Sequence, residues 1–180
     1  MSTTDTSHPQ SQPDQSQAAE PSQPAEPAVA VKGLGHIVLY VSSLERSVAF
    51  YRDVLGWPLV LGGSSELPAA GFSAGTTHHD LLLIEVGPGA TPIPRGRRVG
   101  MYHFGVKMGD TDDELRAVLA RLQAHPDLVR VVGATDHGVT HSLYVLDPDG
   151  NEVELYIDVA DVDWRADPSL IASPPRPLTL

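Results

Sequence analysis

The chain reads LGHIVLYV at residues 34–41 and MYHFGVKM at residues 101–108. Both runs are rich in β-branched and aromatic residues, which favours strands, and each carries one histidine near its start. These histidines are His36 and His103. The two runs therefore indicate that one structural unit occurs twice along the chain.

A helical pattern behind a candidate N-cap follows each strand, over residues 44–55 and 112–124. Three shorter strand-like segments follow each helix, at residues 57–61, 71–75 and 79–86 in the first half and at 128–132, 141–146 and 151–157 in the second. A repeat of this kind indicates that neither unit closes its own core. We therefore predict an α+β fold of two tandem βαβββ modules, at about residues 33–90 and 100–160, whose sheets share one concave surface.

Composition narrows the kinds of chemistry open to the chain. Its 180 residues include eight histidines and no cysteine, which excludes a disulfide scaffold, a thiolate zinc site and a cysteine nucleophile. With 23 acidic against 12 basic side chains and a formal net charge of −11, the chain is a poor nucleic-acid binder. We therefore expect a small-molecule partner and a metal, if one is present, held by nitrogen and oxygen.

The two ends differ in composition from the middle. Residues 1–32 are rich in Pro, Gln, Ser and Ala, which predicts a disordered tail. We see no secretion signal and no apolar run long enough to span a membrane, so we expect a cytoplasmic protein. Residues 33–165 form the predicted single domain, and a proline-rich extension at 166–180 is expected to cover the mouth of the cleft or a subunit interface.

Strand periodicity brings possible metal ligands onto one surface. Alternate strand residues face the same side, so His36 and His103 each share a face with the residues two and four positions further on. Glu154 lies in mid-strand between Val153 and Leu155, where a carboxylate is costly to bury unless a cation or a donor meets it. Two imidazoles and one carboxylate with open positions are the donor set of non-haem Fe(II) oxygenases.

Four strings of sequence resemble a known superfamily. They are GHIVLYV at 35–41, SVAFYRDVLGW at 47–57, HHD at 78–80 and DPDGNEVELY at 147–156. Together they resemble the vicinal oxygen chelate superfamily, which contains glyoxalase I, antibiotic-binding resistance proteins and the type I extradiol dioxygenases. The resemblance covers about residues 33–165 and implies an open mixed β-barrel of two βαβββ modules around a metal.

Similarity to the catechol 2,3-dioxygenases implies roles for individual residues. Fe(II), or Mn(II), would be bound by His36, His103 and Glu154. His79 resembles the acid/base histidine near dioxygen, and His137 and Tyr144 resemble the substrate-side pair, although the interval between these two is about two residues shorter than in that family. The resemblance thus implies a homodimeric oxidoreductase of aromatic-compound catabolism that cleaves an aromatic diol with dioxygen.

Two alternatives stay open at this stage. Glu85 follows His36 by 49 positions, much as Glu154 follows His103 by 51, so Glu85 is a candidate fourth ligand. A His-Glu-His-Glu set resembles glyoxalase I, a lyase that would use Ni(II) or Zn(II). The other alternative is a metal-free protein that binds a drug or metabolite in the same cleft.

Overall fold

The computed structural model describes residues 29–63 and 66–180. Its main compact unit is Leu34–Leu180, which includes the C-terminal extension. The predicted disordered tail lies outside the described residues over positions 1–28, and residues 29–33 contain neither helix nor strand. All the described helices and strands lie within the unit that begins at Leu34.

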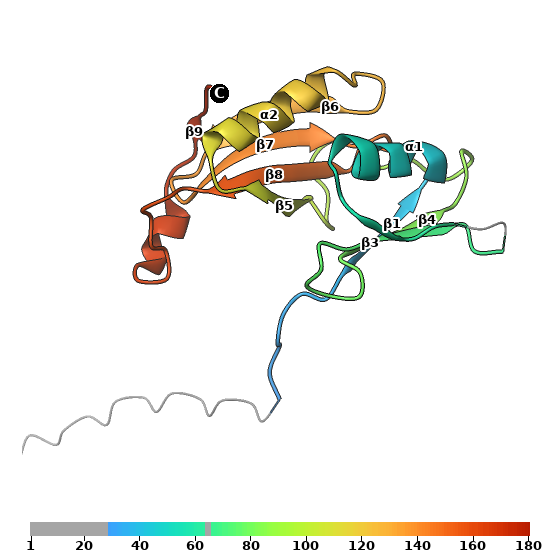
Figure 1. Cartoon of the computed structure of the whole chain (residues 1–180), viewed down its shortest axis with the longest axis horizontal. Helices are drawn as coiled ribbons and strands as arrows, with labels where there is room; N and C mark the ends of the chain where they lie inside the picture. The colour runs from blue at the N-terminus through green and yellow to red at the C-terminus, as the bar shows by residue number, and fades with distance from the viewer. Residues whose placement is uncertain (1–28, 64–65) are drawn as a thin grey trace, which may run out of the picture. The chain divides into compact units, whose positions relative to one another are not determined.

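Two βαβββ modules make up this unit, as predicted (Figure 1). The first contains β1 (Ile37–Val41), α1 (Leu44–Val48) with its π-helical continuation Ala49–Val54, β2 (Leu59–Leu61), β3 (Ala69–Phe72) and β4 (Leu81–Glu85). The second contains β5 (His103–Gly109), α2 (Asp112–Gln123), β6 (Arg130–Asp136), β7 (Thr140–Leu146) and β8 (Glu152–Asp158). Side chains cap both helices: Ser43 accepts from the Arg46 N–H and Thr111 from the Glu114 N–H.

Each module forms one mixed sheet. The strand orders are β1-β4-β3-β2 and β5-β8-β7-β6, with a short β9 (Arg176–Pro177) added beside β6. In both sheets the first strand runs parallel to the last, with Ile37 opposite Leu81 and His103 opposite Glu152. The same connectivity in both modules confirms the predicted repeat.

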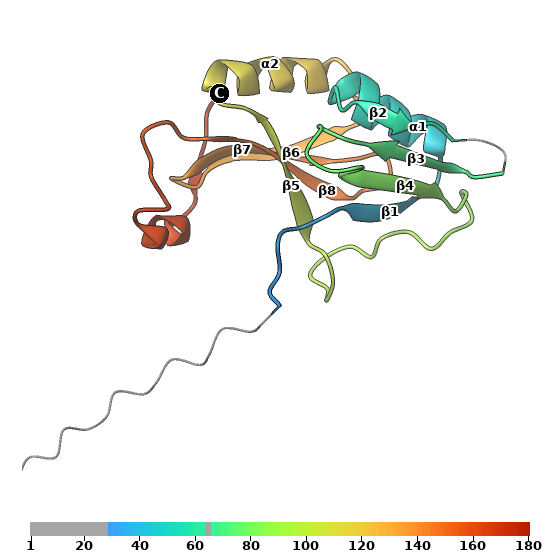
Figure 2. The same ribbon diagram turned by 60° about the horizontal axis from the view of Figure 1, so that its bottom comes forward.

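Both helices cover the same side of the two sheets (Figure 2). In the first module, Leu39 and Val41 of β1 are buried in one core with Phe50 and Val54. The second module contributes the α2 and β8 residues Leu115, Val118, Leu122, Val153 and Leu155 to that core. The opposite strand face is open, since Val38 and Tyr40 of β1 are 45% and 71% exposed. The side of β1 that carries Val38 and Tyr40, directly after the predicted ligand His36, therefore faces away from the helices.

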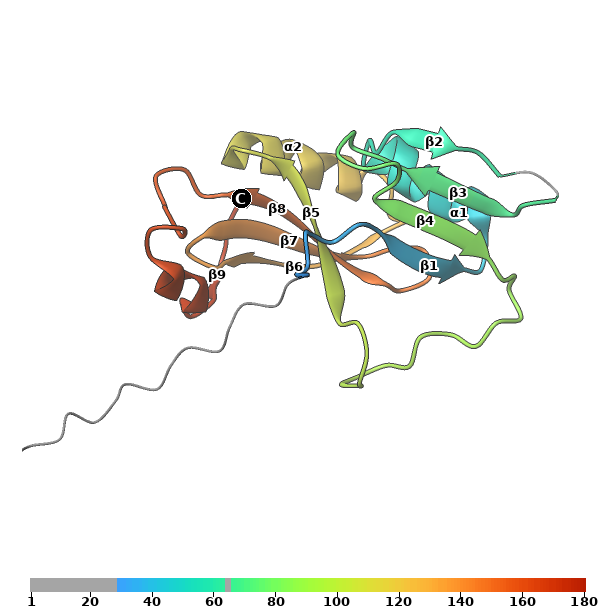
Figure 3. The ribbon, with the colours of Figure 1, turned by 90° about the horizontal axis from the view of Figure 1, so that it is seen from below.

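A buried hydrogen bond joins the two modules. The Tyr51 hydroxyl donates to Asp147 Oδ2 at 2.9 Å, and both residues are almost fully buried. Burial raises the pKa of both groups, and the neighbouring Asp147 charge raises that of Tyr51 further. Seen from below, the start of β1 lies beside β5 (Figure 3), and residues from both line a cavity of about 450 Å³. The arrangement of the modules within one chain is therefore fixed by buried contacts.

The C-terminal extension folds back onto the second module. It contains a 3-10 helix at Pro168–Ala172, and β9 pairs antiparallel with β6. Leu178 and Leu180 pack against the core. Over the residues that the structure covers, we find no helix with the length and apolarity needed to cross a membrane.

Candidate metal and substrate site

Four of the six predicted site residues gather on the open face of the second sheet. Glu154 projects from the middle of β8, and Tyr144 lies directly opposite it on β7. His103 opens β5, with Nε2 at 3.2 Å from Glu154 Oε2. His137 follows β6 and places Nε2 at 2.9 Å from the Tyr144 hydroxyl. Hydrogen bonds link His137 to Tyr144 and Tyr144 to Glu154, and an ion-pair distance links Glu154 to His103; these four residues are called the sheet-face cluster.

The two oxygens of Glu154 have different surroundings. Oε1 accepts hydrogen bonds from the hydroxyls of Ser142 at 2.7 Å and Tyr144 at 3.1 Å. Oε2 faces the His103 ring instead. The carboxylate is therefore held through one oxygen and presents the other toward His103.

Ser142 is a site residue that the sequence interpretation missed. It is fully buried, and it shares its strand face with Tyr144 because the two are two positions apart on β7. The sequence did contain a signal for Ser142. It is a small hydroxyl residue two positions before Tyr144, in a strand next to the one that carries the mid-strand glutamate.

The Tyr144 hydroxyl is held in its protonated form. Burial raises its pKa well above the usual value, and the adjacent Glu154 carboxylate raises it further. A protonated Tyr144 that donates to Glu154 must receive its second hydrogen bond from His137 Nε2–H. In the neutral His137 ring, donation from Nε2 leaves Nδ1 as an acceptor.

The hairpin that carries His137 is short but holds the side chain in place. The backbone N–H of His137 donates to the Thr140 carbonyl at 2.9 Å. Gly138 adopts a φ of +81°, a conformation that glycine accepts without strain. The two-residue shortening noted in the sequence therefore leaves His137 in contact with Tyr144.

Space and unpaired atoms surround the His103–Glu154 pair. His103 Nδ1 and Glu152 Oε1 are buried and have no hydrogen-bond partner within the described residues, and they lie 3.7 Å apart. A Cβ at Gly105 would lie 3.3 Å from the Tyr156 ring and 3.8 Å from Glu154 Oε2. Glycine at this position thus keeps the space beside the carboxylate open. Nitrogen and oxygen donors of this type suit a divalent metal such as iron.

The other two predicted residues belong to the first module and lie just before β1 and β4. The His36 ring is 4.4 Å from that of His79 and 5.9 Å from that of His78. Burial lowers the pKa of His79, and the neighbouring His78 and His36 lower it further. His79 Nε2 is buried and meets no hydrogen-bond partner in the part of the chain that the structure describes. We call His36, His78 and His79 the histidine cluster.

One chain does not bring the predicted metal triad together. Among residues 29–63 and 66–180, no three His, Asp or Glu side chains are arranged so that they could hold a metal ion. His103 and Glu154 are adjacent, while His36 lies in the histidine cluster of the other sheet. The triad stays a prediction, and its completion requires a source of His36.

The alternative in which Glu85 is a fourth ligand has no support in the strand register. Strand pairing places Leu82, rather than Glu85, at the position that corresponds to Glu154, because Leu82 lies opposite Val38 as Glu154 lies opposite Gly105. The Glu85 side chain instead caps α1, where Oε2 accepts from the Leu44 N–H at 2.6 Å. The spacings from His36 to Glu85 and from His103 to Glu154 are similar because the connections between strands are longer in the second module. The two glutamates are not structurally equivalent.

Comparisons with known proteins agree with this fold. The family model described as Glyoxalase/Bleomycin resistance protein/Dioxygenase superfamily matches residues 33–155. Among solved structures, a glyoxylase/bleomycin resistance protein/dioxygenase domain from Frankia sp. EAN1pec has a TM-score of 0.60 at 19% identity, over 72% of this chain and 99% of that one. At this level of identity the likeness concerns the fold alone.

Sequence relatives include dioxygenases that act on aromatic diols by name. The chain is 36% identical over 136 residues to the catechol-2,3-dioxygenase of Bacillus subtilis (strain 168), covering 74% of this chain and 44% of that protein. It is 35% identical over 129 residues to biphenyl-2,3-diol 1,2-dioxygenase 3 of Rhodococcus globerulus, covering 69% and 63%. The chain thus spans about half the length of the curated relatives it matches. With its repeated modules and this match over most of its length, the chain belongs to the glyoxalase/bleomycin resistance protein/dioxygenase superfamily.

Proposed function

We propose that this chain is an extradiol ring-cleaving dioxygenase that inserts dioxygen into a catechol-type diol. Fe(II), with Mn(II) as the alternative, would be held by His36, His103 and Glu154. The observation that carries the proposal is the sheet-face cluster, because it joins an acid/base pair to a possible metal carboxylate through one hydroxyl. The relationship to two aromatic-diol dioxygenases supports the same activity.

In such a reaction, residues of the sheet-face cluster would accept a proton from the diol and orient it. A bound Fe(II) would supply the open positions and the electron transfer that bring a diol and dioxygen to react. A catechol must lose protons to bind a metal, and His137 Nδ1 is the acceptor nitrogen that can take one. Tyr144, kept protonated, orients the diol oxygen and fixes Glu154 through its hydrogen bond.

His79 would serve the dioxygen side of the site. Its ring packs against His36, so it would lie beside the metal if His36 is a ligand. Its lowered pKa favours the neutral ring at neutral pH, which can donate from one nitrogen and accept at the other. We assign it the transfer of a proton to reduced dioxygen during ring cleavage.

A second copy of the chain would complete the metal site. Among the described residues of one chain, His36, His103 and Glu154 do not form a group that could hold a metal ion. β1, which directly follows His36, exposes Val38 and Tyr40, and a partner would cover these side chains. We therefore propose a homodimer in which one chain supplies the histidine cluster and its partner supplies the sheet-face cluster.

Anaerobic loading with Fe(II) followed by catechols and air tests the activity. We expect about one iron per site, oxygen uptake and a yellow ring-cleavage product. Glu154→Gln should abolish all three, whereas the matched variant Glu85→Gln should retain them because Gln can still accept from the Leu44 N–H. Absence of oxygen uptake across a broad catechol panel from iron-loaded protein would refute the proposal.

The metal content separates the alternatives. Retention of zinc or nickel with loss on Glu85→Gln would favour a four-ligand lyase instead. Tight binding of an aromatic compound by protein that retains no metal would favour a binding protein. We expect neither result, because Glu85 is bound to the start of α1.

A further inference from the structure

A cavity of about 280 Å³ opens onto Glu154. Its lining comes partly from the second sheet, with Val139, Thr140, Tyr156 and Asp158 beside Glu154. The remainder comes from Trp164 and Ile171, which belong to the C-terminal segment, defined here as residues 164–178. Trp164 and Ile171 lie beyond residues 33–155, the part that the superfamily model matches. This wall is therefore a feature of this chain rather than of the shared modules.

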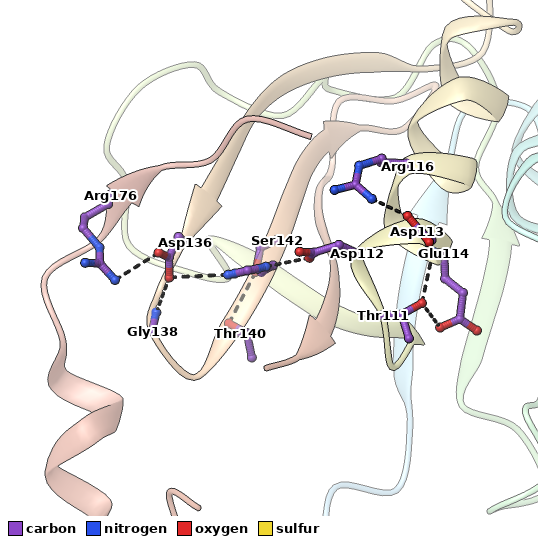
Figure 4. A network of polar contacts seen from close by, with 11 residues as sticks. Thr111, Asp112, Asp113, Glu114, Arg116, Asp136, Gly138, Thr140, Ser142 and Arg176 are labelled. Carbon is purple, nitrogen blue, oxygen red and sulfur yellow. Dashed lines mark hydrogen bonds and ion pairs between the residues drawn. The ribbon is translucent and has the colours of Figure 1, made fainter. Parts of the chain in front are cut away.

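Ion pairs and hydrogen bonds tie the C-terminal segment to the hairpin that carries His137. Arg176 Nη2 lies 3.0 Å from Asp136 Oδ2, and Asp136 Oδ1 accepts from the Gly138 N–H at 2.6 Å (Figure 4). His141 continues this network, with Nδ1 at 2.6 Å from Asp112 Oδ1 and Nε2 at 3.8 Å from Asp136 Oδ1. The network ends at the start of α2, so it is anchored in the body of the second module.

Backbone contacts hold the same part of the C-terminal segment. β9 pairs with Thr135 and Asp136 of β6, and the Leu178 N–H donates to the Ala134 carbonyl. Ser173 packs so closely on the hairpin that a Cβ at Gly138 would lie 3.2 Å from its Oγ. The segment is thus an ordered wall of the cavity and not a loose extension.

The lining has the character of an aromatic binding pocket. An indole ring and three apolar or aromatic side chains line the cavity together with two carboxylates, Glu154 and Asp158, and Ile171 is 58% exposed. A cavity of about 150 Å³ is enough to enclose benzene, and pockets for larger ligands begin near 300 Å³. The volume here matches one ring with a short substituent and lies below that of pockets for larger ligands.

We infer that Trp164 and Ile171 form the wall against which the ring of the diol packs, and that this wall selects single-ring catechols. The inference rests on the proposed function for the position of the two diol oxygens at Glu154. It goes beyond that function because it names the specificity-determining residues and the size class of the substrate.

Tryptophan fluorescence reports on this wall directly. The chain has two tryptophans, so Trp57→Phe leaves Trp164 as the single emitter. We expect saturable quenching of Trp164 in the full-length Trp57→Phe protein, without air, by catechol and 4-methylcatechol. We expect at least tenfold weaker binding of 2,3-dihydroxybiphenyl.

Ile171→Ala tests the selection by size. Removing this side chain should weaken catechol binding by roughly 5- to 30-fold and narrow its preference over 2,3-dihydroxybiphenyl. Val60→Ala is the matched control, because Val60 is an apolar residue of similar exposure (56%) on β2 that does not line the cavity. It should leave both affinities unchanged.

The outcomes separate this inference from the proposed function. Quenching of Trp164 with the expected size preference supports the wall even if iron-loaded protein consumes no oxygen, a result that would overturn the dioxygenase instead. Catechol binding seen by calorimetry without any change in Trp164 emission overturns the wall. Ring cleavage with an unaltered preference in Ile171→Ala overturns it as well.

Discussion

Mixing two inactive variants should restore activity if the metal site lies between chains. His36→Ala removes a ligand from the histidine cluster, and Glu154→Ala removes one from the sheet-face cluster of the other sheet. Each variant alone has no complete triad in any dimer. A mixed dimer carries both substitutions in one of its two sites and neither in the other, because symmetry makes each chain contribute to both sites.

The expected recovery follows from this geometry. Random re-pairing of equal amounts gives about half mixed dimers, and half of the sites in each mixed dimer are intact. Activity and bound iron should therefore reach about one quarter of those of the same amount of unaltered protein. The two variants are mixed in mild denaturant, returned to buffer without air, loaded with Fe(II) and assayed for metal content and for catechol-dependent oxygen uptake.

A site within one chain gives a different result. Every chain of the mixture then lacks one ligand, and neither iron nor activity returns. As a control, His36→Ala mixed with His79→Ala should stay inactive, because both substitutions fall in the same cluster. Recovery by that control pair, or no recovery by the first pair despite mixed dimers detected by mass spectrometry, would refute the reasoning.

Three further variants test contacts described above. Tyr51→Phe leaves the buried Asp147 carboxylate with one donor fewer and should lower the free energy of unfolding by about 1–3 kcal/mol in urea; an unchanged midpoint contradicts this. Ser142→Ala removes one of two hydroxyl donors to Glu154 and should weaken iron affinity about 10- to 100-fold in a chelator competition, whereas unchanged affinity would make Ser142 a packing residue only. The pKa of Asp136 is lowered by the hydrogen bond from the Gly138 backbone N–H and then by nearby positive charges. The stability that this carboxylate contributes to the fold is therefore present above about pH 4 and is lost on acidification below it. The asparagine of Asp136→Asn does not titrate in this range, so the melting temperature of the variant should fall less than that of the unaltered protein between pH 5 and pH 3. An equal fall would contradict a stabilising role for the ionised Asp136.

Local patterns predicted the elements of the modules well. Period-two alternation correctly placed Val38 and Tyr40 on one face of β1, since both are exposed while Leu39 and Val41 are buried. The helix starts at residues 44 and 112 were correct because the cap of each helix lies immediately before its first turn. Such signals act over a few residues and can be read without the fold.

The pairing register of the strands was harder to predict from the sequence than the strands themselves. The predicted strand from His79 to Val86 put His79 and Glu85 on one face, but β4 begins at Leu81 and His79 lies in the preceding bend. Counting positions then matched Glu85 to Glu154, whereas strand pairing matches Leu82 to it. Equal spacing in sequence cannot replace pairing, because loops between strands differ in length between the two modules.

The sequence by itself determined the repeated module, the absence of sulfur ligands and the identity of the candidate donors. Only the tertiary structure decided how those donors are grouped. It groups His36 with His78 and His79, adds Ser142 to the Glu154 carboxylate, and brings the proline-rich extension to the cavity beside it. The physical reason is that alternation and capping are set by neighbours along the chain, whereas the grouping depends on how two sheets pack around a shared core.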